Sequence, residues 1–228
     1  MTQEESVCSE VIFLIGAGAS IPIGIPGMQG IYRAFLNKSK SSITSEEKRT
    51  CRFLTKNLGV PEDLEELLLS ANAIAEFNLS SLGKLVEKCV SVRQSSKQVI
   101  IYRSRLKDRI LDIATLKRRI LDFLSDTCFK FDRTRAIEIF NGFVKGVSHR
   151  GYTVFTTNYD FALEYVATEQ GITIHDNFVE NGQRNLWNES IQFPVGGALT
   201  LVKLHGSVTW YEDEEGTIEK IYHNPSVA

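Results

Sequence analysis

Five consecutive apolar residues, Val11–Ile15, run directly into Gly16 and Gly18. An apolar run without polar alternation and rich in β-branched residues is typical of a strand buried on both faces of a parallel sheet. The helix-breaking residues over 22–27 predict a loop after this strand, and a helix is expected from about Met28 to Asn37. The start of the chain therefore predicts an α/β fold, in which helices cover a parallel sheet.

Two later segments repeat the pattern of a strand that ends in polar residues. They are residues 152–160, YTVFTTNYD, and residues 199–207, LTLVKLHGS. Because the carboxyl ends of parallel strands meet at one edge of a sheet, the first glycine turn should converge there with Asn158, Asp160 and His205. Such a convergence predicts a ligand-binding site at that edge.

Each member of this group also has an ordinary structural interpretation. Gly16 and Gly18 allow positive φ and close approach of a phosphate, but they equally suit a tight turn without a ligand, because the third glycine of GxGxxG is missing. A histidine at a strand end is more often structural than catalytic, and Asn-Tyr-Asp also suits a turn or a helix cap. Only the group as a whole indicates a site.

Residues 43–149 lack strand patterns and predict a helical insertion. Helices are expected from Pro61, from Lys97 to Leu124 and from Thr134 to Ser148, because apolar residues recur at three- and four-residue steps. Basic residues between Arg103 and Arg119 alternate with acidic and apolar ones, which favours a solvated or protein-contacting face over a nucleic-acid track. After the last strand, residues 210–222 predict a β-hairpin.

Composition limits the function classes. The 228 residues suit one large domain, or one domain with an insertion, although two compact halves are also compatible. The 26 basic and 28 acidic residues give a net charge of −2, which provides no general attraction to nucleic acids or anionic membranes. The acidic amino terminus and the short apolar run fit neither a signal peptide nor a membrane span, so a cytoplasmic protein is expected.

The cysteines, Cys8, Cys51, Cys89 and Cys128, stand singly without a CxxC pair. This spacing predicts reduced thiols, with neither a zinc site nor a disulfide framework.

The segments GAGAS followed by GIP, then TTNYD, then KLHGS resemble the motifs of the SIR2 (sirtuin) superfamily, in the same order and at the expected strand ends. The chain is more similar still to the SIR2-like domains of prokaryotic anti-phage defence proteins, which carry TTNYD and LHGS forms and a helical insertion between the first two motifs. The resemblance covers about residues 11–210. It implies a Rossmann-like parallel sheet of the SIR2 type over residues 1–228, with the insertion at about 43–149.

The chain also departs from this family. No cysteine follows Cys128, whereas protein-deacylating sirtuins carry a four-cysteine zinc module after the catalytic histidine. GIP continues with Gly27, Met28 and Gln29, where the family usually has an acidic and an aromatic residue. The family's later strand and adenosine-binding loop do not occur before Ala228, so we expect a longer protein, another segment or another subunit to complete the adenosine site.

The resemblance implies hydrolysis of NAD+ as a substrate, by cleavage of the bond between nicotinamide and ribose, and an antiviral role through NAD+ depletion. Asn158 would orient ribose hydroxyls and water, Asp160 would bind the carboxamide or order its loop, and His205 would act as a general base. The implied NAD+-binding residues are Gly16, Ala17, Gly18, Ser20, Gly24, Ile25, Pro26, Thr157, Gly206 and Ser207. A homo-oligomer or a partner defence subunit is implied, without a membrane or direct nucleic-acid partner. The alternatives are a regulatory module that binds NAD+ or ADP-ribose without cleavage and, less well supported, a protein deacylase.

The scattered cysteines generate the first prediction, which concerns metal content. Elemental analysis of the purified protein should find no stoichiometric zinc, because four single cysteines do not provide the closely spaced ligands of a structural zinc site. One zinc per chain would contradict this expectation and would favour the deacylase interpretation.

Overall fold

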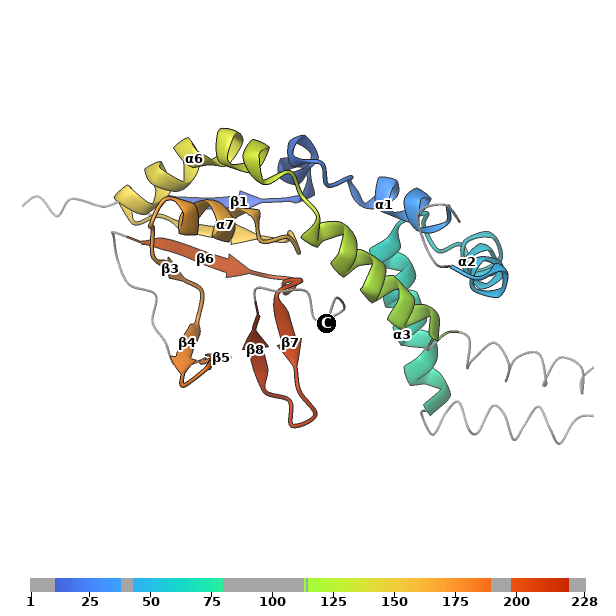
Figure 1. The fold of residues 1–228 in the computed structure, drawn as a ribbon. Coiled ribbons are helices and arrows are strands. Elements are labelled where there is room, and N and C mark those ends of the chain that lie inside the picture. Colours follow the sequence, from blue (N-terminus) through green and yellow to red (C-terminus); the bar gives the residue numbers. More distant parts are fainter. Residues whose placement is uncertain (1–10, 38–42, 80–112, 114, 190–197, 222–228) are drawn as a thin grey trace, which may run out of the picture. The chain divides into compact units, whose positions relative to one another are not determined.

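The computed structural model describes residues 11–37, 43–79, 113, 115–189 and 198–221 (Figure 1). The chain divides into two compact units. Unit 1 comprises Met1–Ile25 and Ser125–Ala228, and unit 2 is Pro26–Leu124, inserted between the two parts of unit 1. The helical insertion expected at about 43–149 overlaps unit 2, while the last helix of that range, α6 (Arg133–Arg150), belongs to unit 1.

Unit 1 contains a four-stranded parallel sheet with the strand order β1-β2-β6-β3. Its strands are β1 (Ile12–Ile15), β2 (Thr153–Thr156), β6 (Leu199–Lys203) and β3 (Ile174–His175). The expected α/β class and parallel sheet are therefore confirmed, and the arrangement is compatible with a Rossmann-like fold.

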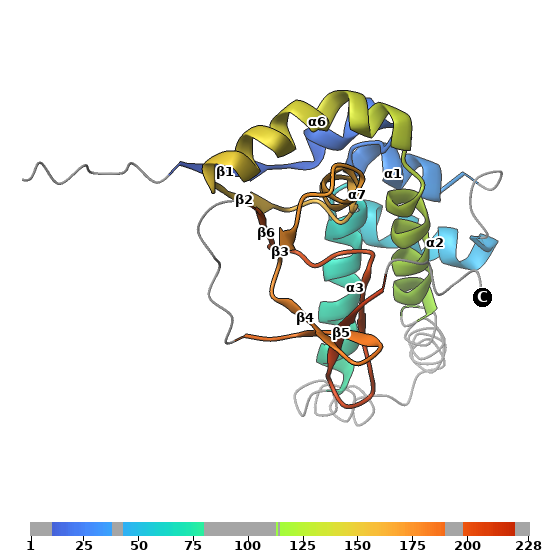
Figure 2. The same cartoon turned by 60° about the vertical axis from the view of Figure 1, so that its left-hand side comes forward.

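The chain connections determine what lies on each face of this sheet. The steps from β1 to β2 and from β2 to β3 run in the same direction across the sheet, so right-handed crossovers place α6 and α7 (Ala162–Glu169) on the same face. These two helices are in contact. The step from β3 back to β6 runs in the opposite direction, and a second sheet lies on the other side of the first one (Figures 1 and 2).

The expectation that the first strand is buried on both faces was wrong. β1 is an edge strand, and its side chains alternate between half-buried Phe13 and Ile15 and exposed Ile12 and Leu14, which are 60% and 72% exposed. Phe13 packs edge-to-face on Phe143 of α6, with 5.3 Å between ring centroids. An unbroken apolar run cannot distinguish a central strand from an edge strand, because it contains no polar residue to mark the outward face.

The loop expected after β1 is instead a 3-10 helix, η1 (Ala17–Ile23), with Pro22 inside it. The i to i+3 hydrogen bond from Ala19 N to Gly16 O, 3.0 Å long, begins this turn. Gly16 has a φ of −112°, so the positive φ anticipated at the first glycines does not occur there. It occurs at Gly24, with a φ of 95°, which caps the end of η1.

The second sheet of unit 1 is antiparallel, with the order β4-β5-β8-β7. Its strands are β4 (Phe178–Asn181), β5 (Arg184–Trp187), β8 (Ile218–Lys220) and β7 (Trp210–Glu212). Phe178, Trp187 and Trp210 pack together, with ring centroids 5.2–5.5 Å apart. The predicted hairpin is confirmed as β7 and β8 within the described residues, whereas the hairpin of β4 and β5 had not been predicted.

Unit 2 is helical in its described residues. Its helices are α1 (Met28–Phe35), α2 (Ser45–Leu58), α3 (Leu64–Leu79) and a helical segment over 115–129 that continues into unit 1. The helix expected from Pro61 begins at Leu64, because the Asp63 carboxylate accepts hydrogen bonds from the backbone N–H groups of Glu65 and Glu66. Most of the helix expected from Lys97 lies outside the described residues.

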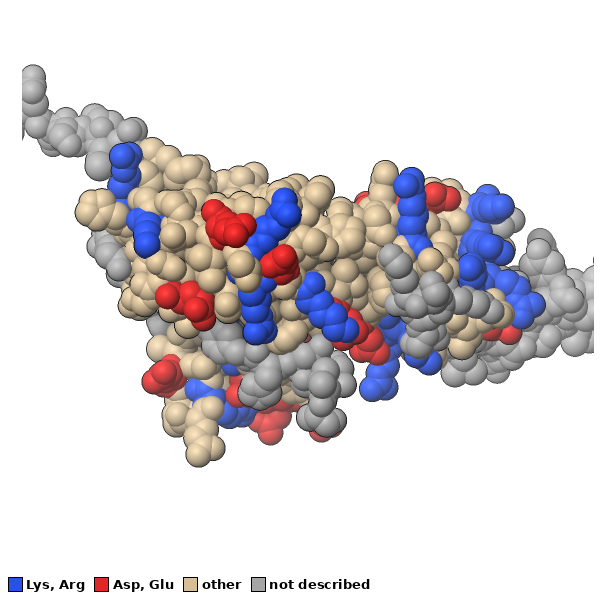
Figure 3. Space-filling view, turned by 45° about the horizontal axis from the view of Figure 1, so that its top comes forward, with Lys and Arg blue, Asp and Glu red and all other residues tan. Residues whose placement is uncertain are grey.

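Charged side chains of both signs are interspersed on the face drawn in Figure 3. Within the described part of the basic segment, Arg119 forms an ion pair with the buried Glu47 of α2, with 3.4 Å between Nε and Oε1. This contact is an example of the protein-contacting role expected for that segment. Among the described residues, no helix has the length and apolar character needed to cross a membrane.

The start of α2 generates a prediction about stability. The Thr44 hydroxyl accepts from Glu47 N, and the Glu47 side chain accepts from Thr44 N, which together form a capping box. Thr44→Ala should lower the free energy of unfolding by about 1 kcal/mol, measured by urea denaturation with circular dichroism. Thr44→Ser, which keeps the hydroxyl, should be close to the wild type, and an equal loss in both variants would contradict the capping role.

Candidate functional site

Three segments meet at the carboxyl edge of the parallel sheet: residues 16–20, which include the start of η1, residues 157–161 after β2 and residues 204–208 after β6. Backbone hydrogen bonds join them directly. Thr157 N donates to Ile15 O at 3.1 Å, Leu204 N to Thr156 O at 2.9 Å, and Val208 N to Tyr159 O at 2.9 Å. The predicted convergence of the three motif segments is thus present in the structure.

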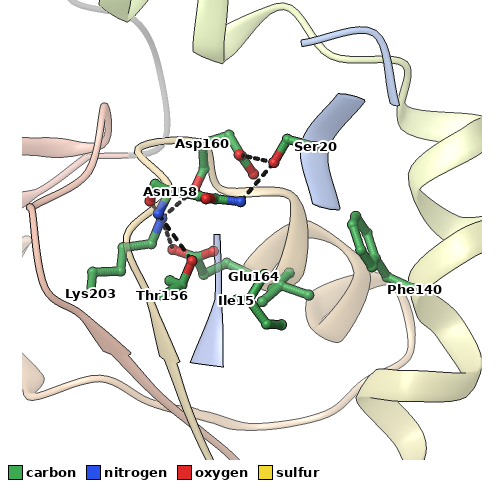
Figure 4. Close-up of a pocket in the computed structure, with 9 residues that line it drawn as sticks. Ile15, Ser20, Phe140, Thr156, Asn158, Asp160, Glu164 and Lys203 are labelled. Carbon is green, nitrogen blue, oxygen red and sulfur yellow. Dashed lines mark hydrogen bonds and ion pairs between the residues drawn. The ribbon is translucent and has the colours of Figure 1, made fainter. Parts of the chain in front are cut away.

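Side chains of the first two motifs form a hydrogen-bonded network (Figure 4). The Ser20 hydroxyl donates to Oδ2 of Asp160 at 2.6 Å, and Nδ2 of Asn158 donates to the Ser20 hydroxyl oxygen at 2.8 Å. Ser20 and Asp160 are buried. Because the short hydroxyl–carboxylate bond is charge-assisted, Ser20 couples the two segments strongly although 140 positions separate the bonded residues.

Both carboxylate oxygens of Asp160 have partners within the protein. Besides the bond from Ser20, Oδ1 accepts from Ala162 N at 3.0 Å, at the first residue of α7. Asp160 therefore connects η1, the loop 157–161 and the beginning of α7.

Asn158 has one buried polar atom without a partner. Its Oδ1 receives no hydrogen bond from the described residues, although its Nδ2 is engaged by Ser20. The side chain lines a small pocket with room for a water-sized molecule. The pocket residues are Ile15, Ser20, Phe140, Thr156, Asn158, Asp160, Leu163, Glu164 and Lys203. A buried carbonyl oxygen beside such a pocket is an acceptor available to water or to a ligand hydroxyl.

Two charged residues of this site, Lys203 and Glu164, were not predicted from the sequence. Lys203 ends β6, and its side chain points into the pocket with that of Glu164 from α7 (Figure 4). Both side chains are only 2% exposed, and Nζ lies 3.2 Å from Oε1 of Glu164. The alternation of Leu199, Leu201 and Lys203 was a usable signal, because period 2 places all three side chains on one face of the strand, and all three are buried.

The third motif lies beside the second one. His205 is exposed and lies near Tyr159, with 6.3 Å between ring centroids. Gly206 has a φ of 83°, in the left-handed region that favours glycine. The Ser207 hydroxyl donates to Tyr159 O at 3.3 Å, so the His-Gly-Ser segment is attached to the loop that carries Asn158 and Asp160.

The glycine turn presents open backbone to solvent. Gly16, Ala17 and Gly18 are exposed, and a Cβ added to Gly18 would have no heavy atom within 4 Å. A Cβ added to Gly16 would lie 3.9 Å from Oγ1 of Thr157, which places that predicted residue beside the turn.

The GIP segment divides between the two units. Gly24 is exposed, Ile25 is buried in unit 1, and Pro26 begins unit 2. The boundary between the two units therefore falls within this segment.

Among the described residues, no cluster of three or more His, Cys, Asp or Glu side chains could hold a metal ion. Comparison of the chain with protein-family models and with curated protein sequences finds no match.

One buried thiol is influenced by the charges of the site. Burial raises the pKa of Cys128 from 9.0 to about 12; the negative charge of Asp160 raises it as well, whereas the positive charge of Lys203 lowers it. In the unfolded chain the thiol ionises at its ordinary pKa, so the unfolded state loses this proton before the folded state does. The stabilisation from the neutral thiol is complete below pH 9.0 and declines as the pH rises towards about 12.

We therefore predict that Cys128→Ala weakens the alkaline destabilisation of the protein. Between about pH 9 and pH 12, each such thiol steepens the fall in unfolding free energy by about 1.4 kcal/mol per pH unit. Urea unfolding at a series of pH values should show a shallower decline for the variant. Burial also raises the pKa of Cys51, in unit 2, to about 12. Cys51→Ala is therefore the matched variant for comparison with Cys128→Ala. Parallel curves for wild type and Cys128→Ala would contradict the prediction.

Proposed function

We propose that this chain is a SIR2-like NAD+ hydrolase, which cleaves the bond between nicotinamide and ribose and releases nicotinamide and ADP-ribose. The observation that carries the proposal is the network of Ser20, Asn158 and Asp160, which joins the first and second motifs at the carboxyl edge of a parallel sheet. This edge is where open α/β sheets bind nucleotides.

The reaction needs three contributions from the protein. Nicotinamide leaves C1′ of the ribose with the bonding electron pair, and the ribose passes through an oxocarbenium-like state, as in glycoside hydrolysis. Water then adds to C1′ and loses a proton to a base. The protein must hold the leaving group, stabilise the positive ribose and position the water.

Asn158 is suited to position the water or a ribose hydroxyl. Its Oδ1 is a buried acceptor beside a water-sized pocket, and the bond from Nδ2 to Ser20 fixes the direction of the amide. Of the two roles considered for Asp160, the geometry favours ordering of the loop over direct binding of the carboxamide, because both of its oxygens already accept hydrogen bonds.

His205 and the glycine turn account for the remaining roles. His205 is exposed at the end of β6, in a segment bonded to the loop of Asn158, so it can approach a bound ribose as the general base. The backbone at Ala17 and Gly18 is open to solvent and would hold the diphosphate through its N–H groups. We place the enzyme in the prokaryotic cytoplasm, where an oligomer or a partner subunit would trigger NAD+ depletion during infection.

The proposal predicts that Asn158→Ala and His205→Ala each reduce NAD+ turnover by at least about 100-fold, the effect expected for loss of a positioned acid–base or orienting group. Nicotinamide release is measured by chromatography with the purified chain, alone and with added cell extract as a source of an activating partner. Urea unfolding verifies that both variants are folded.

Two exposed residues of the same types serve as matched controls. Asn181→Ala, at the end of β4, and His149→Ala, in the last turn of α6, should retain wild-type turnover. Near-normal turnover in Asn158→Ala or His205→Ala would refute the assigned mechanism. NAD+ binding without turnover in the wild type, and unchanged by His205→Ala, would instead favour the regulatory binding module.

A further inference from the structure

The ammonium of Lys203 is buried beside the site, with its side chain 2% exposed. It contacts three oxygen atoms. Nζ donates to the backbone carbonyl of Asp160 and, at 3.4 Å, to that of Asn158, and it forms the ion pair with Oε1 of Glu164 at 3.2 Å. A lysine ammonium has three hydrogens to donate, and two of them go to these backbone carbonyls.

Two of the three contacts are with the residues that carry the proposed chemistry. Lys203 does not reach the side chains of Asn158 and Asp160; it binds their backbone carbonyls from the end of the adjacent strand. The intervening residue, Tyr159, is bound through its carbonyl by Val208 N and the Ser207 hydroxyl. All three carbonyls of the segment Asn158-Tyr159-Asp160 are therefore held by the β6 strand and the loop that follows it.

The ion pair itself is not an obvious stabilising device. Burying two charges carries a large desolvation penalty, and apolar pairs of similar size often stabilise a fold as well or better. The Nζ–Oε1 contact also lacks the alignment of a hydrogen bond, since Oε1 counts no hydrogen-bond partner among the described residues. The role of Glu164 is then to neutralise Lys203, which leaves the charge of Asp160 as the net charge of the pocket.

We infer that Lys203 is a positioning residue, which holds the backbone of the Asn158-Tyr159-Asp160 segment so that Oδ1 of Asn158 faces the pocket, while Glu164 balances its charge. For catalysis this inference rests on the proposed NAD+ hydrolase function. The net negative charge left in the pocket would favour the positively charged nicotinamide ring and the oxocarbenium-like ribose over neutral ligands.

The test compares two double variants, each of which removes a buried lysine–carboxylate pair without leaving an unpaired charge. Lys203→Met/Glu164→Gln removes the pair of the site. Lys220→Met/Asp176→Asn removes a matched pair, in which Lys220 of β8 contacts Asp176 between β3 and β4, and neither residue lines the pocket. We expect the first variant to lose about ten- to hundred-fold in kcat with KM within about twofold, because misplacement of a reacting group by about 1 Å has effects of this size. The control variant should keep wild-type kcat.

A single variant separates the carbonyl contacts from the ion pair. Glu164→Gln keeps the Lys203 ammonium and its bonds to the two carbonyls but removes one negative charge beside the pocket, so kcat should fall by less than in Lys203→Met/Glu164→Gln. If Glu164→Gln loses as much activity as the double variant, or if the double variant is fully active, the positioning role is wrong. If Lys203→Met/Glu164→Gln fails to fold, Lys203→Leu/Glu164→Leu replaces the pair by apolar side chains for the same test, and wild-type kcat in that variant would overturn the inference.

Hydrogen exchange provides a readout that does not need NAD+. The amides of Ala162 and Val208, which donate to Asp160 Oδ1 and Tyr159 O, should exchange faster in Lys203→Met/Glu164→Gln than in wild type and in the control variant. Unchanged exchange would overturn the inference. A wild-type protein without NAD+ turnover would refute the proposed function alone, since exchange would still decide whether Lys203 holds the loop.

Discussion

Parallel pairing of β1 with β2 is the interaction on which the arrangement of the site depends. The register aligns Ile15 with Thr156, so both strands end at the same level, and Thr157 N continues the pairing by donating to Ile15 O. Only in this register can the turn after β1 bring Ser20 to Asp160. Pairing of β2 with β6 then adds Lys203 and His205 at the same edge. A slip of one residue would reverse the faces of β1 and separate these groups.

The sequence patterns predicted the parts of the structure that local chemistry determines. The parallel sheet, the helices at α1 and α6 and the hairpin of β7 and β8 follow from periodicity and turn residues. The shared edge of Gly16, Asn158 and His205 follows from where strands end. The exposure of Ile12 and Leu14 could not be predicted, because strand order depends on distant pairing partners. The 3-10 turn at η1 was missed because Pro22 and the glycines suggested an irregular loop, whereas a short 3-10 segment tolerates them.

The site combines an acceptor on Asn158, a carboxylate on Asp160 and a buried ion pair beneath them. Motif analysis found the first two because they are polar residues at strand ends. It overlooked Lys203 and Glu164 because a single charged residue in an apolar strand, or in the first turn of a helix, is usually directed to solvent. Their burial depends on α7 packing over the end of β6, which is a tertiary property. The buried ion pair was consequently harder to find than the polar residues at the strand ends.

The insertion of unit 2 between β1 and β2 has a consequence for the order in which the molecule assembles. Ile12 pairs with Thr153, so a ribosome must synthesise all of unit 2 before the partner of β1 emerges. Until then the apolar segment Val11–Ile15 has no strand to join, and such exposed apolar segments are prone to association with other chains. Folding of unit 2 shortens the effective loop between the two strands and so reduces the entropic cost of closing it. The carboxyl edge is completed only when β6 has also been made, which places the Asn158 pocket among the last features to form.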